Sequence, residues 1–499
     1  MNSLSSILRP GASVYFVGIK GTGVCALAEL IHSMGLKTAG SDTNEVFYTD
    51  QILKELDIPF HETFDSAHIN GKIDLVIHSA AYSAENNPEI AEAQKRNIPL
   101  MTYPQALGAF SANFDSTGIA GVHGKTTTTA MAGCLVKGLG LPGRVLVGSA
   151  VSNFGGRSTL SQGDKFFIAE TCEYRRHFLM FHPGRIVLTA VESDHQDYFP
   201  TYESIRDAFA EYVRILPPGG ELIYCADDPG ASEVAKIIKD EGLGGDDGSA
   251  IRLTPYGFTA QGDFHVASYR VENEMAYFRV NAFNLELALP VPGRHQALNA
   301  TAAIALAMSL LKKELAENSD LKNTKSRNEL TQFAVKKALE EFKGSKRRSE
   351  ILGSAGGILF MDDYGHHPTA IKTTLEGLRG FYPARRLAVS FMSHTYTRTA
   401  ALLDEFAASL ASADILFLHK IYASAREKFD GHIDGRSIMD KIEKLPARKA
   451  ELYYVDEPLD AFEQLKKILK PGDLFLTMGA GSNWPLGVKL FEYFSGVSK

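Results

Sequence analysis

The segment Gly121-Val122-His123-Gly124-Lys125-Thr126-Thr127 carries the clearest chemistry in this sequence. Its glycines let backbone N–H groups close on phosphate oxygens, its lysine can reach the β- and γ-phosphates, and a threonine hydroxyl can hold magnesium. The common spacing, Gly-x-x-x-x-Gly-Lys-Ser/Thr, would need a glycine at position 119, where this chain has Ile119. The segment therefore matches a shorter form of the loop. We expect it to bind ATP, because Lys-Thr at a helix start would add little to packing if the segment were only a glycine turn.

A carboxylate and an imidazole follow two strand-like segments downstream of this loop. The segment 166–169 ends at Glu170, and the segment 186–191 is followed shortly by His195. Hard divalent ions favour oxygen ligands, so such groups at neighbouring strand ends can hold magnesium against nucleotide phosphates. We expect Thr126, Glu170 and His195 to serve a magnesium site. The alternative for either strand-end residue is a solvated side chain or a helix cap.

A second glycine loop, Gly18-Ile19-Lys20-Gly21-Thr22-Gly23, follows a strand-like segment at 14–17 and precedes a helix-like segment at 24–34. Its glycines give a shifted form of the dinucleotide-binding fingerprint, and Asp42 follows about where a ribose-binding acid is expected. The loop is compatible with a nicotinamide enzyme, with another nucleotide or with a plain tight turn. Its presence beside an ATP loop favours a nucleotide-linked substrate.

The elements that must position these loops follow an alternating pattern. Short β-branched runs end in glycine or polar clusters and give way to helical periodicity, which predicts an α/β chain with parallel sheets and helical crossovers. A length of 499 residues favours about three domains. A polar stretch at 312–331 and a basic cluster at 343–348 predict a surface excursion and a hinge. The expected domains are residues 1–112, 113–346 and 347–499.

Apolar strands in the last region are followed by polar residues at their carboxyl ends. The pattern occurs at 360–364, 389–394 and 475–481. Ligand crevices of open α/β sheets lie at those strand ends, so we expect these three segments to share one side of the domain.

Bulk composition limits the classes of partner. The hydrophobic content of 44% and the charged content of 22% are near the averages for soluble globular proteins and argue against a disordered, fibrous or membrane protein. The net charge of −7, spread along the chain without long blocks of one sign, argues against nucleic-acid or anionic-membrane partners. The four separated cysteines predict neither a disulfide nor a cysteine-based zinc site. The chain starts without a signal-like pattern, and its apolar stretch at 301–311 is too short for a bilayer. We expect a cytoplasmic protein that acts on small molecules; nothing in the sequence indicates an oligomeric state.

Motifs along nearly the whole chain resemble the Mur ligases of peptidoglycan synthesis. Besides the two glycine loops, these motifs lie at 173–179, 194–195, 293–299, 347–348, 362–368 and 394–399. The resemblance implies a ligase with three domains. An N-terminal Rossmann-like domain would hold a UDP-sugar, a central P-loop-type α/β domain would bind ATP, and a C-terminal Rossmann-like domain would receive an amino acid.

The resemblance also implies roles for individual residues. Those expected to act in catalysis are Lys125, Glu170, His195, Arg348, His394 and Arg398. Those expected around ATP, beyond the phosphate loop, are His295, Asn299, Arg348 and Asp363. Those expected at the UDP-sugar are Gly18, Lys20, Gly21, Thr22, Gly23, Asp42 and Ser79. Arg398 is suited to the carboxylate of the amino acid because a guanidinium group makes two-pronged contacts, the alternative being a surface salt bridge.

Within the family, the resemblance favours the ligase that joins L-alanine to the lactyl carboxylate of UDP-N-acetylmuramate through an acyl phosphate, with ATP and Mg²⁺. The segment 192–213 contains no lysine, which agrees with this member, because a carbamylated lysine belongs to the later ligases of the pathway. A recycling ligase that adds a preformed tripeptide is the nearest alternative, suggested by 366–371 and 153–155, whereas 393–399 favours alanine. A nicotinamide-dependent dehydrogenase would leave Lys125 unexplained. A nucleotide-switch protein would turn ATP over slowly, without response to other substrates.

Overall fold

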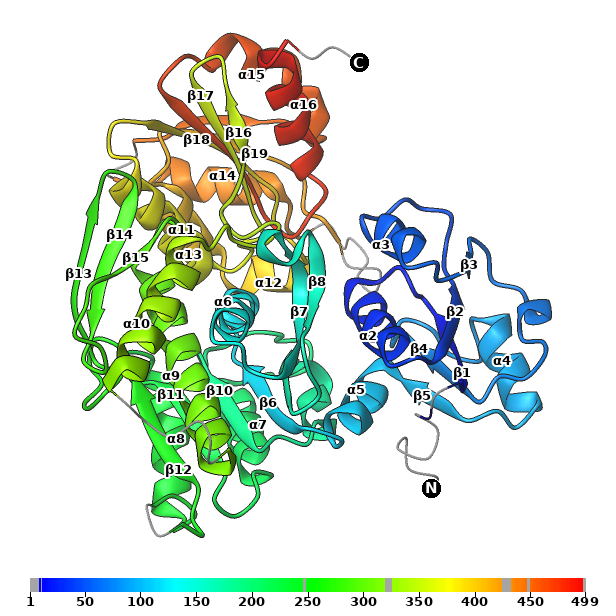
Figure 1. The fold of residues 1–499 in the computed structure, drawn as a ribbon. Helices are drawn as coiled ribbons and strands as arrows, with labels where there is room; N and C mark the ends of the chain where they lie inside the picture. Colours follow the sequence, from blue (N-terminus) through cyan, green and yellow to red (C-terminus); the bar gives the residue numbers. More distant parts are fainter. Residues whose placement is uncertain are drawn as a thin grey trace.

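The computed structural model describes residues 9, 11–245, 248–318, 325–423, 432–446 and 449–496. Three α/β bodies follow one another along the chain, coloured blue, cyan to green, and yellow to red (Figure 1). Each is built on a largely parallel sheet, so the predicted fold class is confirmed. The exact domain boundaries stay predictions. None of the described helices is both long and apolar enough to cross a membrane.

The N-terminal sheet has five parallel strands in the order β3-β2-β1-β4-β5. The strands are β1 (Ser13–Val17), β2 (Lys37–Ser41), β3 (Phe60–His61), β4 (Leu75–His78) and β5 (Leu100–Thr102). The helices are α2 (Thr22–Ser33), α3 (Thr49–Glu55), α4 (Pro88–Lys95) and α5 (Tyr103–Ser111). Strand order reverses at β1, between β2 and β4, and ligands of open α/β sheets bind at such a reversal. The Gly18 loop leaves β1 at that point.

The middle sheet has seven strands in the order β12-β11-β10-β6-β9-β7-β8, of which β8 alone runs antiparallel to its neighbour. The strands are β6 (Asp115–Ala120), β7 (Gly143–Val151), β8 (Arg157–Ser161), β9 (Phe166–Glu170), β10 (Arg185–Leu188), β11 (Glu221–Cys225) and β12 (Arg252–Tyr256). The helices are α6 (Lys125–Gly138), α7 (Tyr202–Arg214), α8 (Pro229–Asp240), α9 (Arg294–Glu317) and α10 (Lys325–Glu340). The phosphate loop follows β6, between the two strands whose ends carry the predicted metal ligands.

A small antiparallel sheet extends the middle body. Its strands are β13 (Val266–Glu272), β14 (Met275–Val280) and β15 (Leu287–Leu289). The polar stretch at 312–331 differs from the surface excursion expected there, since α9 continues to Glu317 and α10 already begins at Lys325. Residues 319–324 lie outside the described residues. Polar composition there marked the ends of two helices, with exposed residues at 316–318 and 328–330.

The C-terminal sheet has six strands in the order β16-β17-β21-β18-β19-β20, with β16 antiparallel to β17. The strands are β16 (Glu350–Ala355), β17 (Ile358–Asp363), β18 (Arg386–Phe391), β19 (Ile415–Leu418), β20 (Glu451–Tyr454) and β21 (Asp473–Met478). The helices are α11 (Pro368–Phe381), α12 (Tyr396–Ala401), α13 (Leu403–Leu410), α14 (Gly435–Glu443), α15 (Phe462–Ile468) and α16 (Trp484–Phe494). β17, β21 and β18 are parallel neighbours that end in register. The prediction that their polar ends share one side is confirmed.

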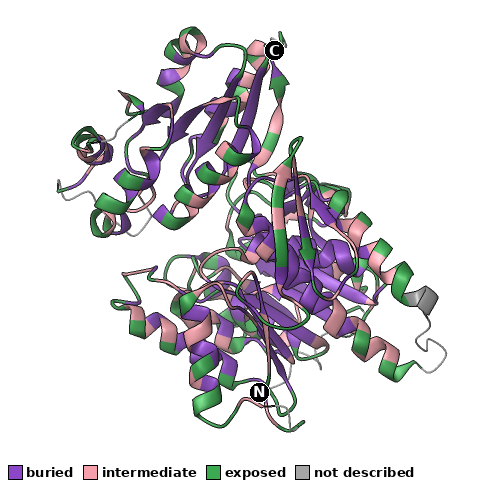
Figure 2. Ribbon diagram, turned by 90° about the vertical axis from the view of Figure 1, so that its left-hand side faces the viewer, coloured by how far each residue is buried: buried purple, intermediate pink, exposed green. Residues whose placement is uncertain are grey.

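The strands form the buried layer of each body, and the outward faces of the helices remain exposed (Figure 2). The helix α7 shows why, since Ile205, Phe209 and Tyr212 recur at helical spacing and are buried, whereas Glu203, Asp207 and Arg214 are exposed. Polar contacts from the β7–β8 ribbon tie the N-terminal body to the middle one. Arg157 Nη1 lies 2.9 Å from Glu29 Oε1 of α2.

Candidate functional site

The phosphate loop joins β6 to α6 along a backbone path that requires glycine at two positions. Gly121 has a φ of +132°, and Gly124, the residue before α6, has a φ of +81°. A side chain at Gly121 would clash with the Thr189 hydroxyl and lie 2.8 Å from the Ala190 nitrogen. The Val122 N–H donates to the Ala190 carbonyl at 2.9 Å. The chain after β10 thus fixes a loop that opens the N-terminus of α6, where phosphate is favoured.

The Lys125 ammonium lies between this loop and a buried carboxylate. It donates to the Gly121 carbonyl and lies 2.9 Å from Glu173 Oε2. Burial alone would lower the pKa of Lys125, but the Glu173 and Glu170 carboxylates outweigh it and raise the pKa above its ordinary value. The side chain is therefore held in its protonated form, the form that pairs with phosphate.

Two of the predicted metal ligands, Thr126 and Glu170, are in contact. Thr126 Oγ1 donates to Glu170 Oε2 at 3.0 Å, and the Gly148 N–H donates to the same oxygen at 3.0 Å. A hydroxyl and a carboxylate are oxygen donors, the kind that Mg²⁺ prefers. These two oxygen donors, of which Thr126 directly follows Lys125, fit the magnesium ion predicted from the sequence.

The third predicted ligand, His195, reaches the same region through a different partner. Its Nε2 lies 3.5 Å from Glu173 Oε1 and 3.8 Å from Asp194 Oδ2. Burial would raise the pKa of the Glu173 carboxyl, but Lys125 and His195 hold it below its usual value. Glu173 therefore pairs with both Lys125 and His195, two of the predicted catalytic residues. The sequence assigned it no role because it lies beyond the end of β9, although it opens the motif at 173–179.

The start of α9 packs against the phosphate loop. Asn299 Oδ1 accepts from the Thr128 hydroxyl at 3.3 Å, and its amide donates to Gln296 Oε1 at 3.2 Å. His295 is one helical turn away, and desolvation lowers its pKa to about 4, with the nearby His123 adding to the effect. These two residues, which the sequence analysis predicts around ATP, thus share one face of α9 beside the loop, and the His295 imidazole is neutral.

The N-terminal glycine loop is held in place by a hydrogen bond to Asp42. Gly18 has a φ of +82°, and a side chain there would lie 3.0 Å from Ser79 Cβ. The backbone N–H of Lys20 donates to Asp42 Oδ2 at 2.7 Å. The Lys20 ammonium is buried and lies 3.2 Å from Asp50 Oδ2. The structure brings the predicted UDP-sugar residues together around β1. Asp42 is already bonded to the Lys20 backbone, and the Lys20 ammonium to other acidic residues of the domain.

Two tyrosines lie close to the residues where the Gly18 loop enters α2. Thr22 Oγ1 accepts from the Tyr48 hydroxyl at 3.2 Å. Gly21 precedes α2, and a side chain at Gly23 would lie 2.8 Å from the Tyr103 hydroxyl. A side chain at position 23 would therefore require the Tyr103 ring to move.

The C-terminal domain reaches the phosphate loop through Arg348. Its Nη2 lies 3.4 Å from Thr126 Oγ1, and the guanidinium lies over the Tyr364 ring at 5.1 Å. Asp363 is buried and accepts from the Ser349 N–H at 2.7 Å, which fixes the turn that carries Arg348. Burial raises the pKa of Asp363 despite the opposing charge of Arg348. Of these two predicted ATP residues, Arg348 faces the loop and Asp363 supports it.

Arg398, predicted for the amino-acid carboxylate, pairs with Asp194 of the middle domain. Its Nη2 and Nε lie 2.7 Å and 3.1 Å from Asp194 Oδ1, and both residues are buried. Burial would raise the pKa of Asp194, but Arg398 holds it far below the usual range. The His394 carbonyl accepts from Arg398 Nη1 at 3.4 Å. The structure thus places His394 and Arg398 together, and it adds Asp194, which sequence reasoning left without a role.

Three family models match the chain in order. They are the Mur ligase family catalytic domain at residues 13–115, the Mur ligase middle domain at 119–307, and the Mur ligase glutamate ligase domain at 347–481.

Individual relatives match over nearly the whole length. The chain is 50% identical over 484 residues to the UDP-N-acetylmuramate--L-alanine ligase of Treponema pallidum (strain Nichols), a match that covers 97% of both chains. The solved UDP-N-acetylmuramate-alanine ligase of Thermotoga maritima is 25% identical, with a TM-score of 0.74 over 97% of this chain and 100% of that one. A murein peptide ligase from Psychrobacter arcticus shares the fold at 21% identity, with a TM-score of 0.65 over 98% of this chain and 100% of that one. The chain belongs to the Mur ligase family.

Proposed function

We propose that this chain joins L-alanine to the lactyl carboxylate of UDP-N-acetylmuramate, with conversion of ATP to ADP and phosphate, in peptidoglycan synthesis. The observation that carries the proposal is the 50% identity, over 97% of both chains, to a relative that bears that name. The site supports the chemistry, since Lys125 and Thr126 of the phosphate loop face Arg348 of the C-terminal domain. The murein peptide ligase from Psychrobacter arcticus is only 21% identical, so its similarity supports the fold and not a choice of substrate.

The reaction requires activation, because a carboxylate does not condense with an amine at a useful rate in water. Transfer of the γ-phosphoryl group to the lactyl carboxylate forms an acyl phosphate and releases ADP. The protonated Lys125 and the Arg348 guanidinium stabilise the negative charge that spreads over the transferred group. Both are positioned before the reaction, Lys125 by Glu173 and Arg348 by its turn.

Amide formation follows on the same carbonyl. The neutral amine of L-alanine attacks the acyl phosphate, the C–O bond to phosphate breaks, and inorganic phosphate leaves while the amine loses a proton. We assign the alanine carboxylate to Arg398, whose fork suits a two-pronged contact. Its three nitrogens already contact Asp194 and His394, so the carboxylate must share or displace one of these contacts.

The magnesium ligands are part of the proposal. Thr126 and Glu170 supply the oxygen donors, and His195 is the third candidate, reached through Glu173. When bound, the ion would neutralise phosphate charge. The UDP-sugar is assigned to the Gly18 loop, at the reversal of strand order in the N-terminal sheet.

A substrate panel tests the proposal. Phosphate release should require UDP-N-acetylmuramate and L-alanine together, and Lys125→Ala should abolish it while UDP-sugar binding persists. Release with a preformed tripeptide and none with L-alanine would assign the chain to recycling instead. Loss of UDP-sugar binding in Lys125→Ala would contradict the assignment of that substrate to the N-terminal domain.

A further inference from the structure

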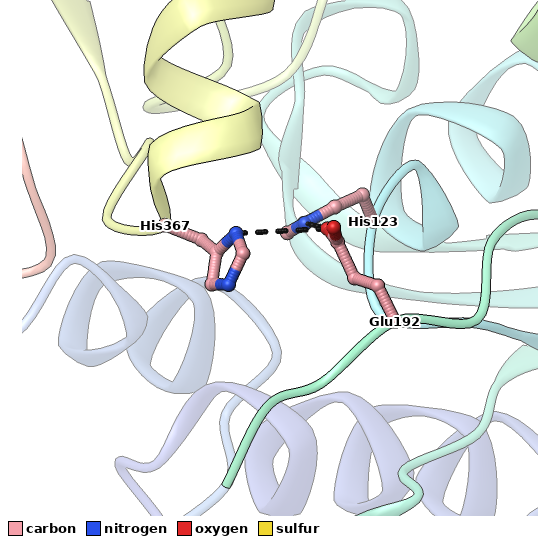
Figure 3. Close-up of side chains that lie close together, drawn as sticks. All are labelled: His123, Glu192 and His367. Atoms are coloured by element: carbon pink, nitrogen blue, oxygen red, sulfur yellow. Dashed lines mark ion pairs between the residues drawn. The ribbon is translucent and has the colours of Figure 1, made fainter. Parts of the chain in front are cut away.

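Three side chains from separate segments meet between the middle and C-terminal domains (Figure 3). His123 lies in the phosphate loop, Glu192 follows β10, and His367 caps the N-terminus of α11. His123 Nε2 pairs with Glu192 Oε1, and His367 Nδ1 lies 3.6 Å from the same oxygen. One potential ligand atom from each residue lies within 4.8 Å of the other two. Two imidazoles therefore share one carboxylate.

The burial and the hydrogen bonds around this cluster are those expected of a metal-binding site. His367 is only 5% exposed, and its Nδ1, the ring nitrogen near Glu192, accepts from the Thr369 N–H at 3.4 Å, long for a hydrogen bond. His123 Nε2 and Glu192 Oε1 are buried and, apart from their mutual ion pair, have no hydrogen-bond partner among the described residues. Buried polar atoms are nearly always satisfied, so these two atoms call for a further partner. The other carboxylate oxygen of Glu192 accepts from the Thr369 hydroxyl at 2.9 Å. Such outer hydrogen bonds orient the ligands of metal sites.

We propose that His123, Glu192 and His367 bind a divalent transition-metal ion, with zinc as the best match. Imidazole nitrogen suits zinc, copper and nickel, whereas Mg²⁺ selects oxygen ligands. Two histidines and one glutamate also form a known type of three-residue zinc site, which leaves a fourth position for water. The site is separate from Thr126 and Glu170, where the donors are oxygens.

The position of the cluster gives the ion a structural consequence. His123 and Glu192 belong to the middle domain and His367 to the C-terminal domain, so a shared ion bridges the two. An ion that binds only the docked arrangement multiplies the docking equilibrium constant by one plus the ratio of its free concentration to its dissociation constant. Zinc should therefore favour docking of the C-terminal domain on the phosphate loop.

Metal titration of the full chain tests the site without reliance on ligase activity. After treatment with a chelator and in excess Mg²⁺, the protein should bind one equivalent of Zn²⁺ by calorimetry. Co²⁺ should give the visible absorption of a four-coordinate nitrogen and oxygen site. X-ray absorption of the zinc-loaded wild-type protein should show two imidazole ligands, a readout that needs no variant.

Variants locate the ion. His367→Asn retains a residue that can cap α11, and His123→Asn changes the other domain; each should weaken zinc binding by about tenfold or more. Glu170→Gln, at the oxygen site, and His182→Asn, at an exposed histidine, should leave zinc binding unchanged. The proposal is overturned if wild-type protein binds no zinc under these conditions, or if the absorption spectrum shows no imidazole. Zinc binding that survives both ligand variants, or that disappears in Glu170→Gln, also overturns it.

Discussion

The buried pair between Asp194 and Arg398 predicts how firmly the C-terminal domain docks. Both side chains are nearly inaccessible, at 5% and 6% exposed, and they lie 2.7 Å apart across the domain interface. Asp194→Asn keeps the shape but leaves Arg398 without its charge partner. Removing one partner of a buried ion pair costs about 3–5 kcal/mol. Because the pair joins two domains, the cost should weaken docking more than the stability of either domain.

The magnitude can be measured. A loss of about 3 kcal/mol shifts the docking equilibrium on the order of 100-fold, which should increase the radius of gyration in small-angle X-ray scattering. The value of kcat/KM for L-alanine should fall by a similar factor. Asp473→Asn is the control, because Asp473 lies 2.8 Å from Arg386 in a pair within the C-terminal domain; it should lower the melting temperature without changing the scattering. If Asp194→Asn matches wild type within about twofold in both scattering and kcat/KM, the assignment of the pair to docking is wrong.

Three further variants test other parts of the site and fold. Gly121→Ala should abolish ATP binding, measured by calorimetry, since φ is +132° and the methyl group would strike Thr189; binding within twofold of wild type would contradict this. Glu173→Gln should reduce kcat with little change in the dissociation constant of UDP-N-acetylmuramate, because Lys125 loses its charged partner; an unchanged kcat would show that Glu173 positions nothing. Burial lowers the pKa of His419 to about 4, so stability should be complete above about pH 6.5 and fall by about 3 kcal/mol as pH drops to 4. Urea unfolding of His419→Gln should lack that decline, and persistence of the full decline would assign it to other groups.

The sequence predicted well what is local and repeated. Glycines at 121 and 124 and the lysine that follows define the phosphate loop, because few residues can adopt its backbone. Alternation of apolar strands and helices predicted the α/β class, and the parallel order of β17, β21 and β18 confirmed that their polar ends share a side. Thr126 and Glu170, 44 positions apart, meet because β6 and β9 are neighbours.

What the sequence could not predict depends on how domains pack. Asp194 lies in the motif at 194–195, but its partner Arg398 is 204 positions away in the sequence, so their pairing could not be predicted. Glu173 lies beyond a strand end, where orientation of a side chain follows from tertiary contacts. The meeting of Glu192 with His367 likewise requires the C-terminal domain to dock on the middle one. No local pattern specifies such contacts.

The central claim is that ATP activates the lactyl carboxylate of UDP-N-acetylmuramate for attack by L-alanine. The most direct measurement uses a lactyl carboxylate labelled with ¹⁸O and follows the released phosphate by mass spectrometry. An acyl phosphate transfers one carboxylate oxygen to phosphate, so the account predicts phosphate with one ¹⁸O atom, formed together with the amide. Unlabelled phosphate, or phosphate release that does not depend on both the UDP-sugar and L-alanine, would contradict it.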